Sequence, residues 1–102
     1  MSTPNSGFWK KLDISNLAGD GELVAAPGAN RRIVLVALTC TVGMAVKETN
    51  TSGDVICHVG TGMNRFPSPI YITANTAVFA EDVHGTAGNI TAFYYTEAID
   101  GV

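Results

Sequence analysis

The stretch RRIVLVALTCTVG, Arg31–Gly43, constrains the fold more than any other part of the chain. It is rich in β-branched and other apolar residues, so it predicts a β-strand. Side chains alternate between the two faces of a strand, and in a small domain usually only one face is dry. Here both faces would be apolar: one would carry Ile33, Leu35, Ala37 and Thr39, and the other Val34, Val36, Leu38 and Cys40.

One of these faces would pack into the core, and the apolar side chains of the other face must be shielded from water by something else. Full burial of a Val or Leu side chain stabilises by about 1.5–3 kcal/mol, and an open apolar patch of this kind usually identifies an interaction surface. We therefore predict a homo-oligomer in which Val34, Val36 and Leu38 lie at the interface. The alternative is that the N-terminal segment, with Phe8 and Trp9, folds back over this face.

Other short β-rich runs alternate with turn residues about every ten positions, and no window shows the periodicity of an amphipathic helix. This spacing predicts an all-β fold, an antiparallel β-sandwich or jelly roll of seven to eight short strands. Pro67 and Pro69 lack backbone N–H groups, which predicts a loop over residues 60–69. The predicted strands are Gly21–Ala26, Arg31–Thr41, Met44–Thr49, Val55–Gly60, Ile70–Thr73, Thr76–Asp82 and Asn89–Ala98, with Trp9–Ile14 as the eighth.

The 102 residues suggest one domain, which we place at residues 21–102, after an N-terminal arm and possible first strand over residues 1–20. The two ten-residue runs, Arg31–Thr41 and Asn89–Ala98, are expected to be central strands. Charged residues make up 15% of the chain, against about 25% in typical soluble domains, which again favours self-association.

The charge pattern argues against a nucleic-acid partner, because the net charge is −3 and only six Lys and Arg are present. The hydrophobic pattern argues against a membrane partner, since the longest apolar run is shorter than the ~20 residues that span a bilayer. We expect a soluble protein made in a cytoplasm. The best candidate for a partner contact is the aromatic–basic cluster Phe8, Trp9, Lys10 and Lys11; the alternative is that Trp9 packs on its own domain.

No residue pattern predicts an enzyme, a cofactor or a metal. The nearest to a metal site is Glu81–His84 with His58 from another strand, and we interpret these histidines as solvated or as hydrogen-bonded within the protein. Cys57 and His58 are strand neighbours that face opposite ways, so they cannot act as a catalytic pair. Cys40 and Cys57 are interpreted as small buried hydrophobes, with a cross-strand disulfide as the open alternative.

Two long segments are LVAAPGANRRIVLVALTCTV and SPIYITANTAVFAEDVHGTAGNITAFYYTE. The first is similar to the opening strands, and the second to the closing part, of small tailed-phage virion proteins, the capsid decoration or cement proteins. The resemblance covers roughly Gly21 to Glu97. It departs from the usual pattern where AVFAEDVHG stands in place of a Gly-Trp-Phe segment.

The resemblance implies a β-sandwich or jelly-roll protein that binds the outside of a capsid shell, often as a homotrimer, and strengthens it against internal DNA pressure. Its partners would be copies of itself and the major capsid protein, and it would be made in the cytoplasm of a bacterial host and located on the virion. A rival reading is a carbohydrate- or receptor-binding module of a phage fibre, in which exposed aromatics form the platform. The candidate residues for that module are Tyr71, Tyr94, Tyr95, Asn75 and Asn89.

Overall fold

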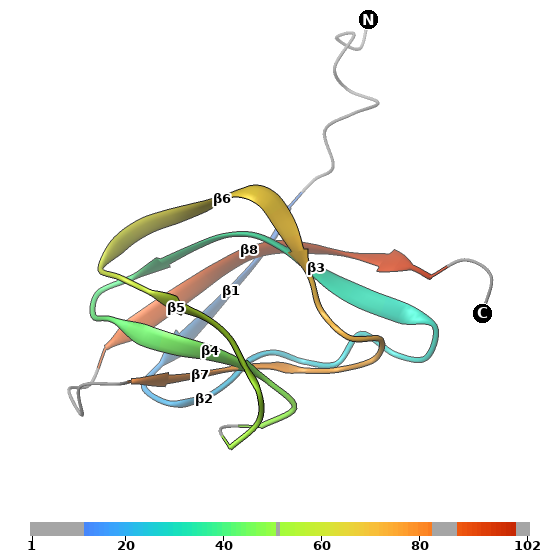
Figure 1. The fold of residues 1–102 in the computed structure, drawn as a ribbon, viewed down its shortest axis with the longest axis horizontal. Coiled ribbons are helices and arrows are strands. Elements are labelled where there is room, and N and C mark those ends of the chain that lie inside the picture. The colour runs from blue at the N-terminus through green and yellow to red at the C-terminus, as the bar shows by residue number, and fades with distance from the viewer. Residues whose placement is uncertain (1–11, 51, 83–87, 100–102) are drawn as a thin grey trace, which may run out of the picture.

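The computed structural model describes residues 12–50, 52–82 and 88–99. All regular structure in these ranges is β-strand (Figure 1). No helix there is long and apolar enough to cross a membrane. The eight strands are β1 (Asp13–Ala18), β2 (Gly21–Val24), β3 (Arg31–Cys40), β4 (Met44–Glu48), β5 (Val55–Val59), β6 (Gly62–Tyr71), β7 (Val78–Asp82) and β8 (Asn89–Ala98).

The strands form two four-stranded antiparallel sheets, in the orders β1-β8-β3-β6 and β2-β7-β4-β5. In Figure 1 the strands β2, β4 and β7 lie below β3 and β8. Set side by side, the two orders match each strand of the first sheet with a strand next to it in the sequence: β1 with β2, β8 with β7, β3 with β4, and β6 with β5. This is the strand order of a jelly roll. The predicted all-β sandwich is confirmed, as are the central positions of β3 and β8.

The core lies between the two sheets and is almost entirely aliphatic. Its largest fully buried side chains belong to both sheets, so neither sheet could bury its inner face without the other. Among the described residues no polar or charged residue is classed as buried. The largest fully buried side chains are Ile33, Val34, Leu35, Leu38, Met44, Val46, Val78 and Ile90. Of these, Val34 lies on the outer side of β3 and not between the sheets.

A β-bulge at Val36 changes the expected assignment of faces along β3. The register of β3 with β8 shifts between Leu35 and Ala37, which leaves Val36 as an extra residue. Leu35 before the bulge and Leu38 after it therefore both belong to the core cluster. The prediction that Val34, Val36 and Leu38 share one open face is wrong, because strict alternation fails at the bulge.

Val34 is not in the core cluster, yet it is fully buried. It pairs in register with Tyr71 of β6 on one side and Tyr95 of β8 on the other. Residues directly opposite in antiparallel strands share a face, so the two tyrosine rings flank Val34 on the outside of the sheet. Val34 and Leu38 are therefore both sheltered within a single chain, and only Val36 keeps partial exposure.

Two predicted elements change by more than the one or two residues that separate the other predicted strand ends from the observed ones. Residues 62–71 form β6, not a loop, although the strand contains Pro67 and Pro69. This strand is the edge of its sheet, where a missing N–H costs no ladder bond, and its register with β3 is interrupted in the same region. The first strand is Asp13–Ala18, shifted from the predicted Trp9–Ile14, and it pairs with β8 throughout as part of the sandwich.

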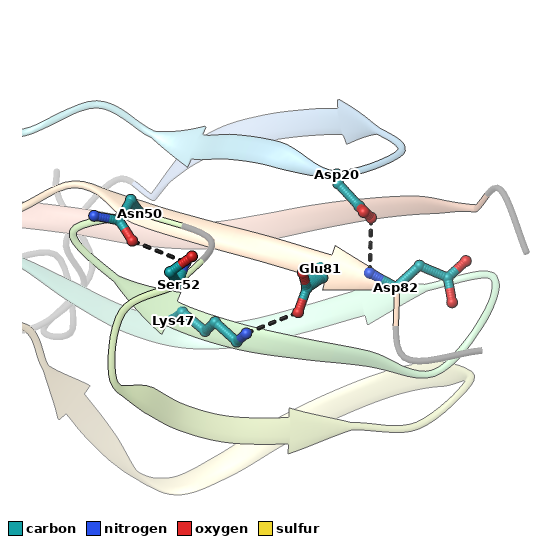
Figure 2. Close-up of polar contacts among 6 residues, drawn as sticks. All are labelled: Asp20, Lys47, Asn50, Ser52, Glu81 and Asp82. Carbon is teal, nitrogen blue, oxygen red and sulfur yellow. Dashed lines mark hydrogen bonds and ion pairs between the residues drawn. The ribbon is translucent and has the colours of Figure 1, made fainter. Parts of the chain in front are cut away.

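Polar contacts join the two central strands of the second sheet and hold two turns at its ends (Figure 2). Lys47 of β4 and Glu81 of β7 form an ion pair of 2.7 Å across neighbouring strands. The Asp82 amide donates to the Asp20 carboxylate at 2.7 Å, which fastens the β1–β2 turn to the end of β7. In the β4–β5 hairpin the Ser52 amide donates to the side chain of Asn50 at 2.8 Å, an Asx turn.

Candidate interaction surface

Among the described residues, most of the exposed large apolar side chains lie on the β1-β8-β3-β6 sheet, and several of them are on its outer face, the face turned away from the core. Alternation and register place Ile14 of β1 beside Phe93 of β8, and Phe93 beside Ala37 of β3. Ile14 is 61% exposed and Met63 of β6 is 53% exposed, both far above the usual exposure of such side chains. The second apolar face inferred from the sequence therefore exists: it keeps Val34 and Val36, but Leu38 belongs to the core and Ala37 lies on the outer face in its place.

One end of this outer face is closed by polar and aromatic side chains. The Arg32 guanidinium lies over the Tyr71 ring, 4.3 Å from its centroid, and its Nε donates to the Glu97 carboxylate at 2.7 Å. Burial, followed by the nearby Glu97 charge, raises the pKa of Tyr95. These groups cover Val34 and present a neutralised charge pair to solvent.

The other end is open and forms a groove of about 350 Å³. Ala37 lies in register with Phe93 on one side and Arg65 on the other. A methyl group between two large side chains leaves a hollow, and the bulge at Val36 bends the strand beside it. The lining residues are Leu12, Val36, Ala37, Met63, Arg65, Phe66 and Phe93.

The chemistry of the groove is suited to contact, not to a reaction. Among the described residues that line it, Arg65 is the only ionisable one, and it is an exposed side chain for which those residues supply no ion pair. An arginine beside aromatic and aliphatic side chains is a composition enriched at protein–protein contacts. The described part of the groove therefore offers the Arg65 cation and an apolar surface to a partner.

Of the residues predicted for an interface, only Val36 lies in the groove. Phe8, Trp9, Lys10 and Lys11 fall outside the described residues. Sequence reasoning missed Leu12, Ile14, Met63 and Phe93. A signal existed for Phe93, which shares its strand face with Thr91 and Tyr95, whereas Met63 lay in a segment interpreted as a loop.

The residues considered for catalysis or metal binding do not lie together. Cys57 packs partly against the core while His58 is exposed on the opposite side of β5, as expected for strand neighbours. His84 lies outside the described residues, and within the described ranges no three His, Cys, Asp or Glu side chains are placed to hold a metal. Cys40 and Cys57 are both free thiols, and burial raises the pKa of each.

The tyrosines of the rival sugar-binding reading are divided between two faces. Tyr71 and Tyr95 flank Val34 on the outer face, but Tyr94 pairs with Leu35 and packs against the core. The Asn75 side chain accepts a hydrogen bond from the Gly28 amide at 3.0 Å, so it already has a structural role in the β2–β3 loop. Asn89 lies at the other end of β8 from Tyr95.

Comparisons with known proteins identify no relative. No family model matches the chain, and neither a curated protein nor a solved structure matches it.

Proposed function

We propose that this protein is a bacteriophage capsid decoration protein, which attaches to the outer surface of a capsid shell as a homo-oligomer and stabilises that shell. The observation that carries the proposal is the open apolar groove on the β1-β8-β3-β6 sheet, where the lining residue Met63, and Ile14 on the same outer face, are each more than half exposed in a single chain. The resemblance of residues 21–97 to small phage virion proteins supplies the kind of partner and implies three copies in each assembly. The jelly roll is used by capsid proteins but also by lectins and cupins, so the fold alone does not select this function.

The mechanism would be the addition of many moderate contacts. A standard protein–protein contact buries about 1,600 Å² in total, and each copy seated across neighbouring capsid subunits opposes their separation. Repetition over the shell accumulates stabilisation without any single strong bond. A chain with few charges and an apolar groove suits such a role, because apolar contact is non-directional and depends on area.

Cosedimentation with capsids that lack this protein tests the proposal. We expect the purified full chain to bind them saturably and to raise their disruption temperature. Met63→Glu places a charge at the groove and should weaken binding by at least about tenfold, since an unpaired charge is costly to bury at a contact. Val55→Glu is the matched control: Val55 is 50% exposed but lies on β5 of the other sheet, so its substitution should leave binding unchanged.

Binding at background level for the unmodified chain would reject the decoration role. Equal losses in the Met63 and Val55 variants would place the contact elsewhere on the molecule. A glycan array, run with the same preparations, measures the rival reading directly, and saturable binding of one sugar together with no capsid binding would favour it.

A further inference from the structure

The two edges of the β1-β8-β3-β6 sheet differ in how they are protected against further pairing. The β6 edge contains Pro67 and Pro69, which cannot donate to an added strand. The β1 edge, Asp13–Ala18, contains no proline and a single charged side chain, Asp13. Edge strands without such protection readily pair with another strand.

The hydrogen-bond pattern shows which backbone groups of β1 remain open. The Gly19 amide donates to the Gly88 carbonyl at 2.7 Å, directly after the register pair Ala18–Asn89. Bonded and non-bonded pairs alternate in an antiparallel ladder, so Asp13, Ser15 and Leu17 direct their backbone groups to β8. The backbone N–H and C=O groups of Ile14, Asn16 and Ala18 therefore point away from β8, to the open edge of the sheet. Within the described ranges, no turn or loop backbone group forms a hydrogen bond with them.

We propose that β1 pairs antiparallel with β1 of a second copy of this chain, so that the sheet continues across a two-fold axis near Asn16. In this register Ile14 lies opposite Ala18 of the partner, and three bonded pairs give about six backbone hydrogen bonds. The geometry suits a second copy because the only charged side chain of β1, Asp13, lies near one end of the strand. The two Asp13 side chains then lie on the order of 20 Å apart, beyond the Debye length at physiological salt.

The same pairing shelters exposed apolar surface. Ile14, 61% exposed, and Leu12, 38% exposed, both lie at this edge, and Leu12 also lines the groove. Joining two copies at β1 would therefore bring their two grooves onto one continuous sheet surface. This inference rests on the self-association in the proposed function, but it predicts a two-fold pair where the family resemblance implies three copies.

Ile14→Pro tests the pairing, because proline removes an outward N–H without removing a bond to β8. Analytical ultracentrifugation of the full chain at about 1–100 µM should show a dimer, with the dissociation constant raised on the order of tenfold to a hundredfold in the proline variant. Ile14→Val is the matched control, since it keeps the N–H and most of the apolar side chain, and it should dimerise normally. Thermal unfolding at a concentration where all variants are monomeric should show that both remain folded.

Hydrogen exchange provides a second measurement. The amides of Ile14, Asn16 and Ala18 should become protected as concentration rises through the dissociation constant. A monomer across the whole range, a trimer that tolerates Ile14→Pro, or protection of these amides in a monomer would each overturn the pairing. A monomer would also remove the homo-oligomer from the proposed function, whereas attachment to the shell is decided separately by capsid cosedimentation, because that assay does not measure stoichiometry.

Discussion

Leu38→Ala should lower the free energy of unfolding by about 3–4 kcal/mol, the usual cost of truncating a fully buried leucine. Leu38 is fully buried in the core cluster between the two sheets. Its truncation removes apolar contacts and leaves a cavity that surrounding strands, fixed by their ladders, can close only in part. For a domain of this size the midpoint of thermal unfolding should fall by at least about 10 °C.

Val36→Ala is the control that makes this experiment informative. Val36 stands two residues earlier, so strict alternation would give the two side chains the same face and similar costs. The bulge instead leaves Val36 partly exposed at the groove, and its truncation should cost less than about 1 kcal/mol. Similar losses in chemical denaturation for both variants would contradict the bulge.

Gly53→Ala should destabilise the chain by about 2–3 kcal/mol through the β4–β5 hairpin. An added Cβ would collide with the backbone carbonyl oxygen of Glu48 and lie 3.1 Å from that of Asn50. Backbone atoms cannot move aside as a flexible side chain can. The turn would open, with loss of the bond from the Gly53 amide to the Asn50 carbonyl at 2.9 Å.

Gly60→Ala serves as its control. No heavy atom lies within 4 Å of the Cβ position at Gly60, and its backbone is outside the left-handed region. Urea denaturation should therefore place this variant within about 0.5 kcal/mol of the parent. If Gly53→Ala were equally neutral, the close approach of Gly53 to Glu48 would be refuted.

The strand layout was accessible from the sequence wherever period-two patterns met turn residues. Asn89–Ala98 was predicted with the observed bounds, and Arg31–Thr41 ends one residue beyond β3. Both were expected to be central, because long apolar runs need partners on two sides. The errors at β1 and β6 have a common cause: an edge strand needs only one neighbour, so it tolerates prolines and polar residues that would disrupt a central strand.

The candidate surface was only half predictable. An excess of apolar residues on β3 indicated that the outer face of its sheet would also be apolar. This follows from the composition of the strand and from the alternation of its side chains alone. Which residues occupy that face depended on the register of three neighbouring strands. Met63 and Ile14 belong to it through pairings with β3 and β8 that join distant parts of the chain.

The sequence by itself determined that this chain folds into β-strands with more apolar side chains than one sheet face can hold. Tertiary structure alone decided which residues of β3 face the core. Every residue from Ile33 to Leu38 is apolar, so a one-residue bulge cannot be recognised from the sequence of this run. The bulge appears only when β8 pairs alongside and two residues must lie opposite one. It directs Leu38 into the core and opens the groove beside Val36.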